Sequence, residues 1–572
     1  MNYGVRYEYY TPVREAHNLD VVFNPTTGLI DSPSRAFTVN NKAAFAPRLG
    51  LTWAPKAAKT VLRGGFGIFY GPGQVEDQLQ PIESDRVSST LTSGPLLVFD
   101  PNQDAVVSSI KSAFAANPNN RNFQPRAYQI DYKIPERVYS YTFSVQQELA
   151  YRMVVTAAYV GSQGRNLFLR GLSNTFRPGA TTILDSTPIP TDAGIVNRTN
   201  AAGQVIGVTT VRQFSIINGT SVQNPFAEID TKSSGGTDSY NSFQLTLTRR
   251  LSNGLTLNSQ YSLARSFGIT SGSNESRTAA QPAGGTPKPV SNDTNNYAAD
   301  LGYNTFDIRH TFNVSAVYDL PFGAGKKHSL GGIGNAILGN WQIGGISNIR
   351  SGVPIDVTVT RPDVVVQCVI AACTINNGAT TTTTVSKGFT ASLPSVSATQ
   401  PLPIGFAAVV NAAGGGSSRQ TRRPDLLPGV DPYLGNDRNF LNPAAFAIPA
   451  PGTYGNLPRN AFKGPDFQQF DLILAKRFPI KESKNFEFRS EFFNIFNGAN
   501  FANPSSTLNS ALPSMTFNAA ANAFVLGSGI QPGQGFTQSS AGTAFGLLRQ
   551  TVERTVGLGT NRQIQFALRL NF

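Results

Sequence analysis

RQIQFALRLNF, residues 562–572, ends the chain on an aromatic residue and alternates apolar with polar side chains. Successive side chains of a strand point to opposite faces, so one face would carry only apolar residues: Ile564, Phe566, Leu568, Leu570 and Phe572. A tilted strand of about 9–11 residues crosses a bilayer, and only a closed barrel leaves no backbone polar group unpaired in lipid. The stretch therefore predicts a strand that spans an outer membrane. The alternative is a soluble sandwich whose last strand alternates.

The composition favours strands and loops over helices. Only 14% of the 572 residues are charged, Gly (54), Phe (38) and Tyr (18) are frequent, and Met (3) and Trp (2) are scarce. These are residues of strands and turns rather than of helix interiors. The most apolar window, VVVQCVIAAC at 364–373, is about half the length of a membrane-spanning helix. We therefore expect an all-β protein without a helical anchor.

The same alternation recurs along the chain. From Ser242, Phe243, Leu245 and Leu247 alternate with polar residues, and after a tight turn at Asn253 the pattern resumes. We predict an antiparallel transmembrane β-barrel portion of about twelve and at most about sixteen strands. The expected strands lie near residues 2–11, 45–54, 61–71, 138–149, 153–169, 240–250, 255–267, 306–319, 341–360, 466–478, 485–496 and 562–572.

Short and long connections alternate between these strands. The short links are PKAAKT, AYR, LSNG and PIKESK, and the link at 320–340 is intermediate. Short periplasmic turns that alternate with long extracellular loops are typical of an outer-membrane barrel, and a sandwich has no reason to keep this order. We expect a periplasmic C terminus, mobile segments at TTTTT (380–384) and GGGSS (414–418), and external loops near residues 12–44, 72–137, 170–239, 268–305, 361–465 and 497–561.

The formal net charge of +13 does not indicate nucleic-acid binding, because the basic residues are scattered and form no recognition motif. We expect instead that some basic residues contact lipopolysaccharide outside the barrel and that others line the pore inside it. Such roles would spread positive charge along many strands. Glu487, Arg489 and Glu491 would share one face of a strand, which favours ion pairs in a water-filled lumen over acid–base chemistry.

No motif indicates catalysis. There is no Gly-flanked serine nucleophile with assignable partners and no HExxH sequence, and His17, His310 and His328 lie far apart. We therefore expect no enzyme activity, no cofactor and no metal site. Cys368 and Cys373 permit a small disulfide loop in an oxidising compartment, and two free thiols are the alternative.

Several segments resemble the β-barrel of TonB-dependent receptors, in particular the Oar-like branch that carries a carboxypeptidase-regulatory-like domain. The resemblance is carried by FAPRLGLTWAP (45–55), TVLRGGFGIFYGP (60–72), YSYTFSVQQELAYRMVVTAAYVGSQGRNLF (139–168), YNSFQLTLTRRLSNGLTLNSQYSLARS (240–266), FDIRHTFNVSAVYDLPFG (306–323), NWQIGGISNIRSGVPIDV (340–357) and FRSEFFNIFNGANFANP (488–504). It implies a 22-stranded barrel in the outer membrane of a Gram-negative-type bacterium. It also implies an N-terminal plug that contacts TonB.

This chain departs from that pattern. It shows no signal peptide, regulatory-like domain, TonB box or plug, and Asn2–Thr11 would correspond to a strand about halfway round the barrel. We therefore expect residues 1–572 to be a single domain, the C-terminal part of a longer receptor with two open sheet edges. Contact with TonB would then be made only through the missing N-terminal part.

The resemblance implies binding of an unknown ligand at the extracellular loops and its import. The alternatives are a structural or adhesive surface protein and a passive pore. A barrel-embedded hydrolase is a further class, but no residues nominate its nucleophile and base. We predict that the outer-membrane assembly machinery reads Phe566, Leu568, Leu570 and Phe572 as its signal. The alternative is that these residues only face lipid.

Overall fold

A computed structural model of the chain describes residues 1–12, 16–17, 22–24, 26–28, 30–31, 39–55, 59–71, 126–129, 132–226, 228–270, 296–323, 325–376, 381–416, 421–436, 438–481, 484–552 and 561–572.

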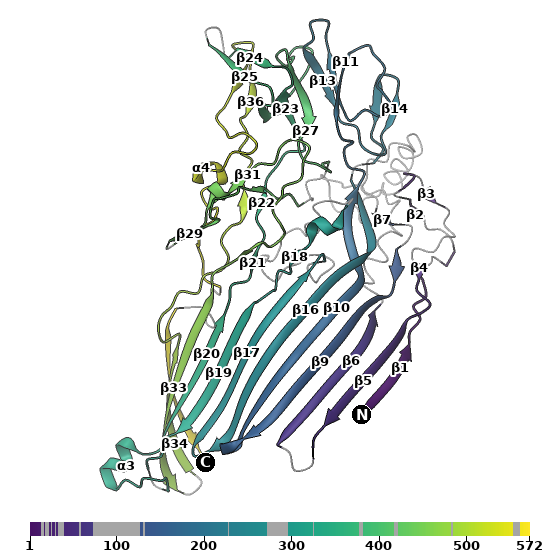
Figure 1. Cartoon of the computed structure of the whole chain (residues 1–572). Helices are drawn as coiled ribbons and strands as arrows, with labels where there is room; N and C mark the ends of the chain where they lie inside the picture. Colours follow the sequence, from purple (N-terminus) through teal and green to yellow (C-terminus); the bar gives the residue numbers. More distant parts are fainter. Residues whose placement is uncertain are drawn as a thin grey trace, which may run out of the picture.

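One large antiparallel sheet of tilted strands dominates the structure (Figure 1). It has fourteen strands, and apart from β7 and β18 they pair in chain order, which confirms the predicted antiparallel barrel sheet. The strands on this path are β1 (Asn2–Tyr7), β5 (Phe45–Trp53), β6 (Thr60–Gly71), β9 (Glu136–Leu149), β10 (Met153–Ser173), β16 (Ile229–Ser252), β17 (Leu255–Gly268), β19 (His310–Asp319), β20 (Trp341–Arg350), β33 (Phe467–Lys481), β34 (Lys484–Phe493) and β38 (Gln563–Asn571).

The pairing register places the predicted apolar residues on one face. One row across the sheet contains Val145, Ala157, Leu245, Tyr261, Phe312 and Ile349, and it ends on β33 at the polar Gln468. The row beside it, on the opposite face, consists of Gln146, Thr156, Thr246, Gln260, Asn313, Asn348 and Gln469. The sheet therefore has an apolar face that suits lipid and a polar face that suits water.

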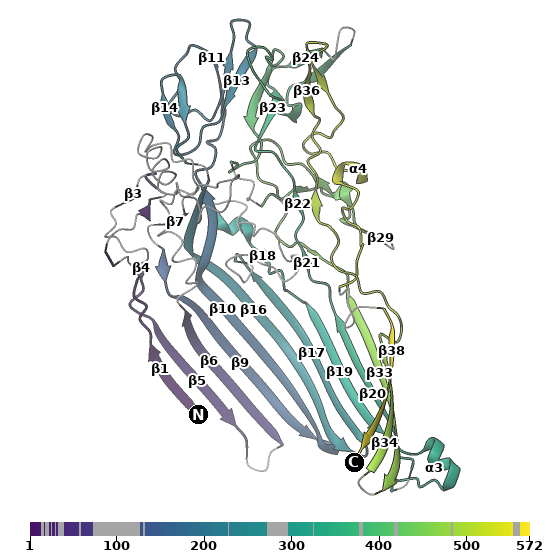
Figure 2. The same cartoon turned by 180° about the vertical axis from the view of Figure 1, so that it is seen from behind.

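The described residues of the short links lie together at one end of the sheet, which we call the turn end, and the C terminus of the chain lies there too (Figures 1 and 2). Between β16 and β17, Asn253 (φ 50°) and Gly254 (φ 78°) form the turn, as expected for a two-residue hairpin turn that needs positive φ at both positions. A Cβ on Gly254 would come within 2.6 Å of the carbonyl oxygen of Asp319. Position 254 therefore requires glycine for two reasons: the positive φ and the steric clash that any side chain would cause.

The long connections lie at the other end, the loop end, where they form small sheets (Figure 2). The small strands are β2 (Val22–Phe23), β3 (Ile30–Asp31), β4 (Val39–Asn40), β7 (Arg126–Tyr128), β8 (Lys133–Ile134), β11 (Ala180–Leu184), β12 (Ile195–Thr199), β13 (Val205–Thr209), β14 (Ile216–Asn218), β15 (Ser221–Gln223), β18 (Gly302–Tyr303), β21 (Pro354–Ile355), β22 (Thr358–Val359), β23 (Val364–Cys368), β24 (Ala372–Asn376), β25 (Thr382–Ser386), β26 (Thr390–Ser392), β27 (Phe406–Val410), β28 (Asp425–Leu426), β29 (Tyr433–Asn436), β30 (Asn439–Leu441), β31 (Phe446–Ala447), β32 (Phe462–Lys463), β35 (Thr507–Leu508), β36 (Met515–Asn518) and β37 (Ala523–Leu526).

Helices are short throughout the described residues. They are the 3-10 helices η3 (Ala150–Arg152), η4 (Tyr297–Asp300) and η5 (Pro443–Ala445), and the α-helices α3 (Gly332–Leu338) and α4 (Gln538–Ala541). None of these helices is long and apolar enough to cross a bilayer.

Five predicted strand boundaries were wrong by four residues or more. β10 ends at Ser173 rather than near 169, and β19 begins at His310 rather than near 306. β1 ends at Tyr7 rather than near 11. β16 begins at Ile229 rather than near 240, because its first residues pair with the upper part of β10 (Ile229 with Ser173). β20 ends at Arg350 rather than near 360, because Pro354–Ile355 and Thr358–Val359 pair instead with β32 and β35 in the loops.

The expectation of mobile polar segments was also wrong for TTTTT, since Thr382–Ser386 forms β25 and pairs with β24. Cross-strand pairing with Ala372–Asn376 gives these threonines the extended conformation that β-branched residues favour. Residue 380 of TTTTT and residues 417–418 of GGGSS lie outside the described residues, as do most of the predicted loop at 72–137, residues 271–295, and parts of the PKAAKT and PIKESK links.

Both edges of the large sheet are open. Within the described residues, β1 pairs only with β5 and β38 only with β34. The predicted open edges are therefore present. Each unpaired backbone group at such an edge costs several kcal/mol in hydrocarbon.

Candidate functional site

The candidate site is the packed assembly of connections at the loop end. We call it the loop head and define it as the described residues of 174–228, 351–466 and 494–562. One apolar cluster joins the second and third of these segments through Ile355, Phe446, Leu508 and Phe545. Another cluster adds the first segment, because Val205 packs with residues such as Phe406 and Phe524. The long connections therefore share a common core.

A buried ion-pair network fastens the loop head to the top of the sheet. Arg423 Nη1 lies 2.7 Å from Asp300 Oδ1, and its Nε lies 3.1 Å from Asp356 Oδ1. The side chains of Arg423 and Asp300 are only 1% and 2% exposed. Burial alone would lower the pKa of Arg423, but the carboxylates of Asp356 and Asp300 outweigh it and raise the pKa, so this guanidinium stays charged. The network joins the connection that follows β17 to the one that follows β20.

Two further basic residues reach from the loop head to the sheet. Arg459 donates to the carbonyl oxygens of Gly268 (2.7 Å) and Ile269 (2.8 Å), at the end of β17. Lys463 forms an ion pair with the buried carboxylate of Asp307, just before β19. These contacts hold the head at the loop end of β17 and β19.

Arg361 is buried within the head, and no carboxylate of the described residues forms an ion pair with it. It donates to the carbonyl oxygens of Pro449 (3.0 Å), Ala450 (2.7 Å) and Thr453 (2.8 Å). Burial, followed by the positive charge of Arg422, lowers its pKa to about 10. Arg361 is therefore a cross-link between loop segments.

A second buried charge cluster lies where β10 and β16 rise toward the head. Arg170 donates to both carboxylate oxygens of Asp230, with an Nη2 to Oδ2 distance of 2.6 Å. Lys232 is fully buried, with its Nζ 4.0 Å from the same carboxylate and 5.4 Å from the ring centroid of Phe168. The cluster stiffens the extended part of both strands.

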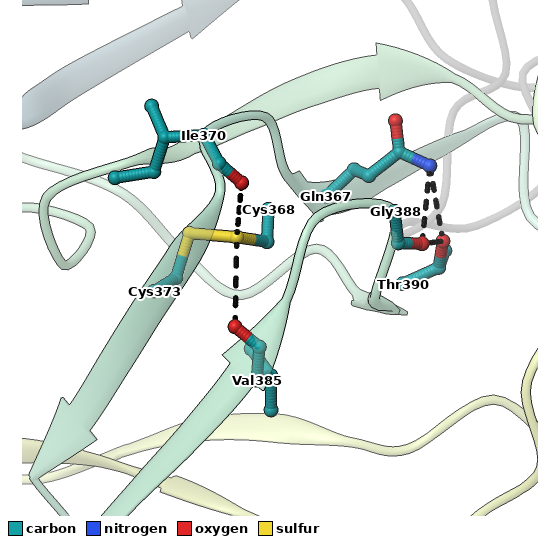
Figure 3. Close-up of a disulfide and its surroundings, with 7 residues drawn as sticks. All are labelled: Gln367, Cys368, Ile370, Cys373, Val385, Gly388 and Thr390. Atoms are coloured by element: carbon teal, nitrogen blue, oxygen red, sulfur yellow. Dashed lines mark hydrogen bonds between the residues drawn. A yellow bond between two sulfur atoms is a disulfide. The ribbon is translucent and has the colours of Figure 1, made fainter.

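The two cysteines lie in the head and are joined. Cys368 and Cys373 form a disulfide with an S–S distance of 2.10 Å, buried in the apolar cluster of Phe406 and Ile375 (Figure 3). The sulfur of Cys368 also contacts the carbonyl oxygens of Ile370 (3.4 Å) and Val385 (3.9 Å). The bond ties the end of β23 to the start of the β24–β25 hairpin.

Replacing both cysteines with serine is expected to destabilise this part of the head. Closing a loop between residues five apart in sequence restricts the unfolded chain by about 2 kcal/mol, and buried serine hydroxyls add a desolvation cost. Hydrogen exchange of β23–β26 would measure the loss of protection. Unchanged exchange there would contradict the prediction, and exchange of β33 and β34 serves as the internal control.

The polar face of the sheet carries the predicted lumenal ion pairs. Arg477 Nε lies 2.9 Å from Glu487 Oε2, and Arg489 Nη2 lies 2.5 Å from Glu491 Oε1. The interpretation of Glu487 and Glu491 as partners in ion pairs is confirmed. These carboxylates are neutralised by guanidinium groups rather than arranged for proton transfer.

The predicted assembly residues lie on the exposed apolar face of β38. Phe566 stacks on Phe488 with centroids 6.2 Å apart, Leu568 is opposite Phe488, and Leu570 is opposite Phe486. Phe572 follows the end of the strand and is 91% exposed. Their role as a signal stays a prediction, since their positions also suit lipid contact.

The described residues contain no group of three or more His, Cys, Asp or Glu side chains that would hold a metal ion. His310 is the first residue of β19, and its Nδ1 lies 2.9 Å from the Tyr261 hydroxyl. His328 contacts the ring of Phe322, with centroids 5.5 Å apart.

Sequence reasoning missed the buried charges of the head. Arg423 is separated from Asp300 by 123 residues and from Asp356 by 67. No local motif marks such a pair. The charged residues near Arg423, such as Arg422 and Asp425, gave no indication of which partners they would meet.

The sheet, its two-faced register and the short turns define an outer-membrane β-barrel domain. The model of the outer membrane beta barrel domain family matches residues 1–392 and 378–565. The chain therefore belongs to this family, and the barrel resemblance stated from the sequence is confirmed at that level. A comparison with curated proteins gives no match.

Three solved structures are similar to this chain. FpvA of P. aeruginosa, bound to a ferric pyoverdine, is 9% identical with a TM-score of 0.30, covering 88% of this chain and 32% of its own. YddB, an outer membrane transporter from Escherichia coli, is 9% identical with a TM-score of 0.31, covering 84% and 39%. The FrpB iron transporter from Neisseria meningitidis is 9% identical with a TM-score of 0.30, covering 87% and 39%. The chain thus spans about a third of the length of the first of these proteins, and the assignment rests on the family match.

Proposed function

We propose that this chain forms the C-terminal part of the barrel of a TonB-dependent receptor, which binds a ligand at the loop head and imports it. The observation that carries the proposal is the packed loop head, in which Arg423, Asp300 and Asp356 join separate connections. A shared core gives the outer surface one defined shape, as ligand recognition requires. The polar face of the sheet offers a water-filled path below it.

The open edges at β1 and β38 support the proposal that further strands of a longer protein complete the barrel. Contact with TonB would then be made by a part of the receptor outside residues 1–572. The barrel exterior would contact lipid and lipopolysaccharide, and the turn end with the C terminus would face the periplasm. Enzyme activity forms no part of this proposal, since the charged pairs described above neutralise one another.

The orientation is tested by thiol labelling in intact cells. Because Cys368 and Cys373 are bonded to each other, a single introduced cysteine is the only reactive thiol. Ala202→Cys in the loop head should react with a membrane-impermeant maleimide in intact cells. Lys484→Cys at the turn end, equally exposed, should react only after the outer membrane is permeabilised. The reverse result would overturn the proposed orientation.

Import is tested with the complete gene product in host cells with and without TonB. The probes are a labelled ferric siderophore, a cobalamin, an oligosaccharide and a peptide. Uptake of one probe that requires both the protein and TonB supports the proposal. Uptake without TonB would favour a passive pore, and adhesion of cells without any uptake would favour the adhesive alternative.

A further inference from the structure

Helix α3 presents apolar side chains to its surroundings at the turn end of the sheet. It lies in the connection between β19 and β20 and projects sideways beside β33 and β34 (Figure 1). Ile333, Ile337 and Leu338 are 79%, 61% and 59% exposed. Ile333 and Ile337 are one helical turn apart, so they share a face. Exposing such an apolar face to water is unfavourable, so the face marks a surface that contacts a membrane or another protein.

The helix is fastened to the apolar face of the sheet. Lys476 lies opposite Trp341 on β20 and opposite Phe488 on β34, in the row that continues to Leu568. Its Nζ donates to the carbonyl oxygen of Gly339 and to that of Asn335 (3.4 Å), at the C-terminal end of α3. Trp341 Nε1 donates to the carbonyl oxygen of Ile337 (2.8 Å).

These contacts explain how the positively charged Lys476 can lie in a lipid-facing row. A lysine is costly on the lipid side of a barrel, but the carbonyl groups at a helix C terminus carry partial negative charge. Lys476 is only 3% exposed and its Nζ lies over the rings of Trp341 (5.6 Å) and Phe478 (5.2 Å). The helix therefore covers the lysine from the lipid side and is held at the edge of the apolar band.

The connection around α3 is also basic. Residues 320–340 contain Lys326, Lys327 and His328 and no Asp or Glu. Lys326 lies 3.5 Å from Asp319, while Lys327 is exposed. An apolar face flanked by lysines, continuous with a lipid-facing surface, matches the apolar interior and the phosphate groups of a phospholipid layer.

We propose that α3 is an interfacial anchor that lies in the phospholipid headgroup layer at the turn end of the barrel. Ile333, Ile337 and Leu338 insert among the upper acyl chains, and Lys327 lies at the phosphates. The anchor goes beyond the proposed function, because it does not depend on which ligand is imported or on whether import occurs. It fixes the height of the turn end relative to the bilayer.

The test uses a polarity-sensitive fluorophore on single cysteines in the protein assembled in outer membranes and reconstituted into vesicles of phosphatidylethanolamine and phosphatidylglycerol. The cysteines are Ile333→Cys in α3, Leu568→Cys on the lipid-facing row, and Lys484→Cys in a neighbouring turn. At residues 333 and 568 the emission maximum of the fluorophore should shift to shorter wavelength, and brominated lipid should quench the emission. At residue 484 the fluorophore should emit as in water and resist quenching.

Two results would overturn the anchor. Water-like, unquenched emission at residue 333 beside quenched emission at residue 568 would show that the helix lies outside the bilayer. Blue emission at residue 333 without quenching by lipid would show that protein covers the helix instead. If Ile333→Cys fails to assemble, as judged by heat-modifiable migration, Ile337→Cys provides the same measurement on the same helix face. Because Leu568 belongs to the predicted assembly signal, Leu245→Cys on the apolar face of β16 replaces Leu568→Cys if that variant fails to assemble.

Discussion

Replacing Arg423 with methionine is expected to loosen the loop head and leave the spanning strands paired. The substitution removes one ion-pair partner of the buried Asp300 carboxylate, and breaking a buried ion pair costs about 3–5 kcal/mol. Hydrogen exchange should therefore rise around Asp300, Asp356 and Asn460, whose backbone N–H donates to Asp356. Exchange in β17, β19 and β20 should be unchanged.

Two further variants make this prediction specific. Arg438→Met changes an exposed arginine in the same connection and should have no effect. Arg423→Met combined with Asp300→Asn should recover part of the protection, because a neutral amide is cheaper to bury than a carboxylate that has lost its pair with Arg423. Equal exchange in wild type and Arg423→Met would contradict a role for the ion pair in holding the head.

Deleting Phe572 is expected to prevent assembly of most of the protein in the outer membrane. Phe572 lies beyond β38, and the ladder between β34 and β38 pairs Gln563–Asn571 without it. A purely structural role would thus predict only the loss of one exposed side chain. A large loss of the heat-modifiable form would therefore indicate recognition of the terminus by the assembly machinery.

Phe496→Ala is the matched control for this deletion. Phe496 is 80% exposed and lies in the connection after β34, so its removal also takes away an exposed aromatic ring. The heat-modifiable fraction, compared in outer membranes at equal expression, is the measurement. Normal assembly of the Phe572 deletion would leave only the lipid-facing role for Phe566, Leu568, Leu570 and Phe572.

The spanning strands could be predicted from the sequence because their signal is local. Each strand places one face in lipid and the other in water, so every second residue of a segment such as Phe243–Leu247 must be apolar. The rule fails above the membrane, where neither face meets lipid. Residues 229–239 continue β16 with a polar, glycine-containing sequence, and residues 354–359 alternate although they leave the sheet.

The loop head could not be predicted in the same way. Its order comes from contacts between residues distant in sequence, such as Arg423 with Asp300 and Val205 with Phe406. Composition marked the TTTTT segment as unstructured, because polar threonines resemble those of a linker. Pairing of β25 with β24 supplies the missing stabilisation, and no local pattern reports it.

The dependence of the head on distant partners sets an order of events during biogenesis. With the orientation proposed above, Arg423 meets Asp300 only when the chain on both sides of β19 and β20 has crossed the membrane. Hairpins can pair one at a time, but the head would close only after the last of its segments has been exported. We therefore expect the loop head to be the last part of this chain to reach its final structure.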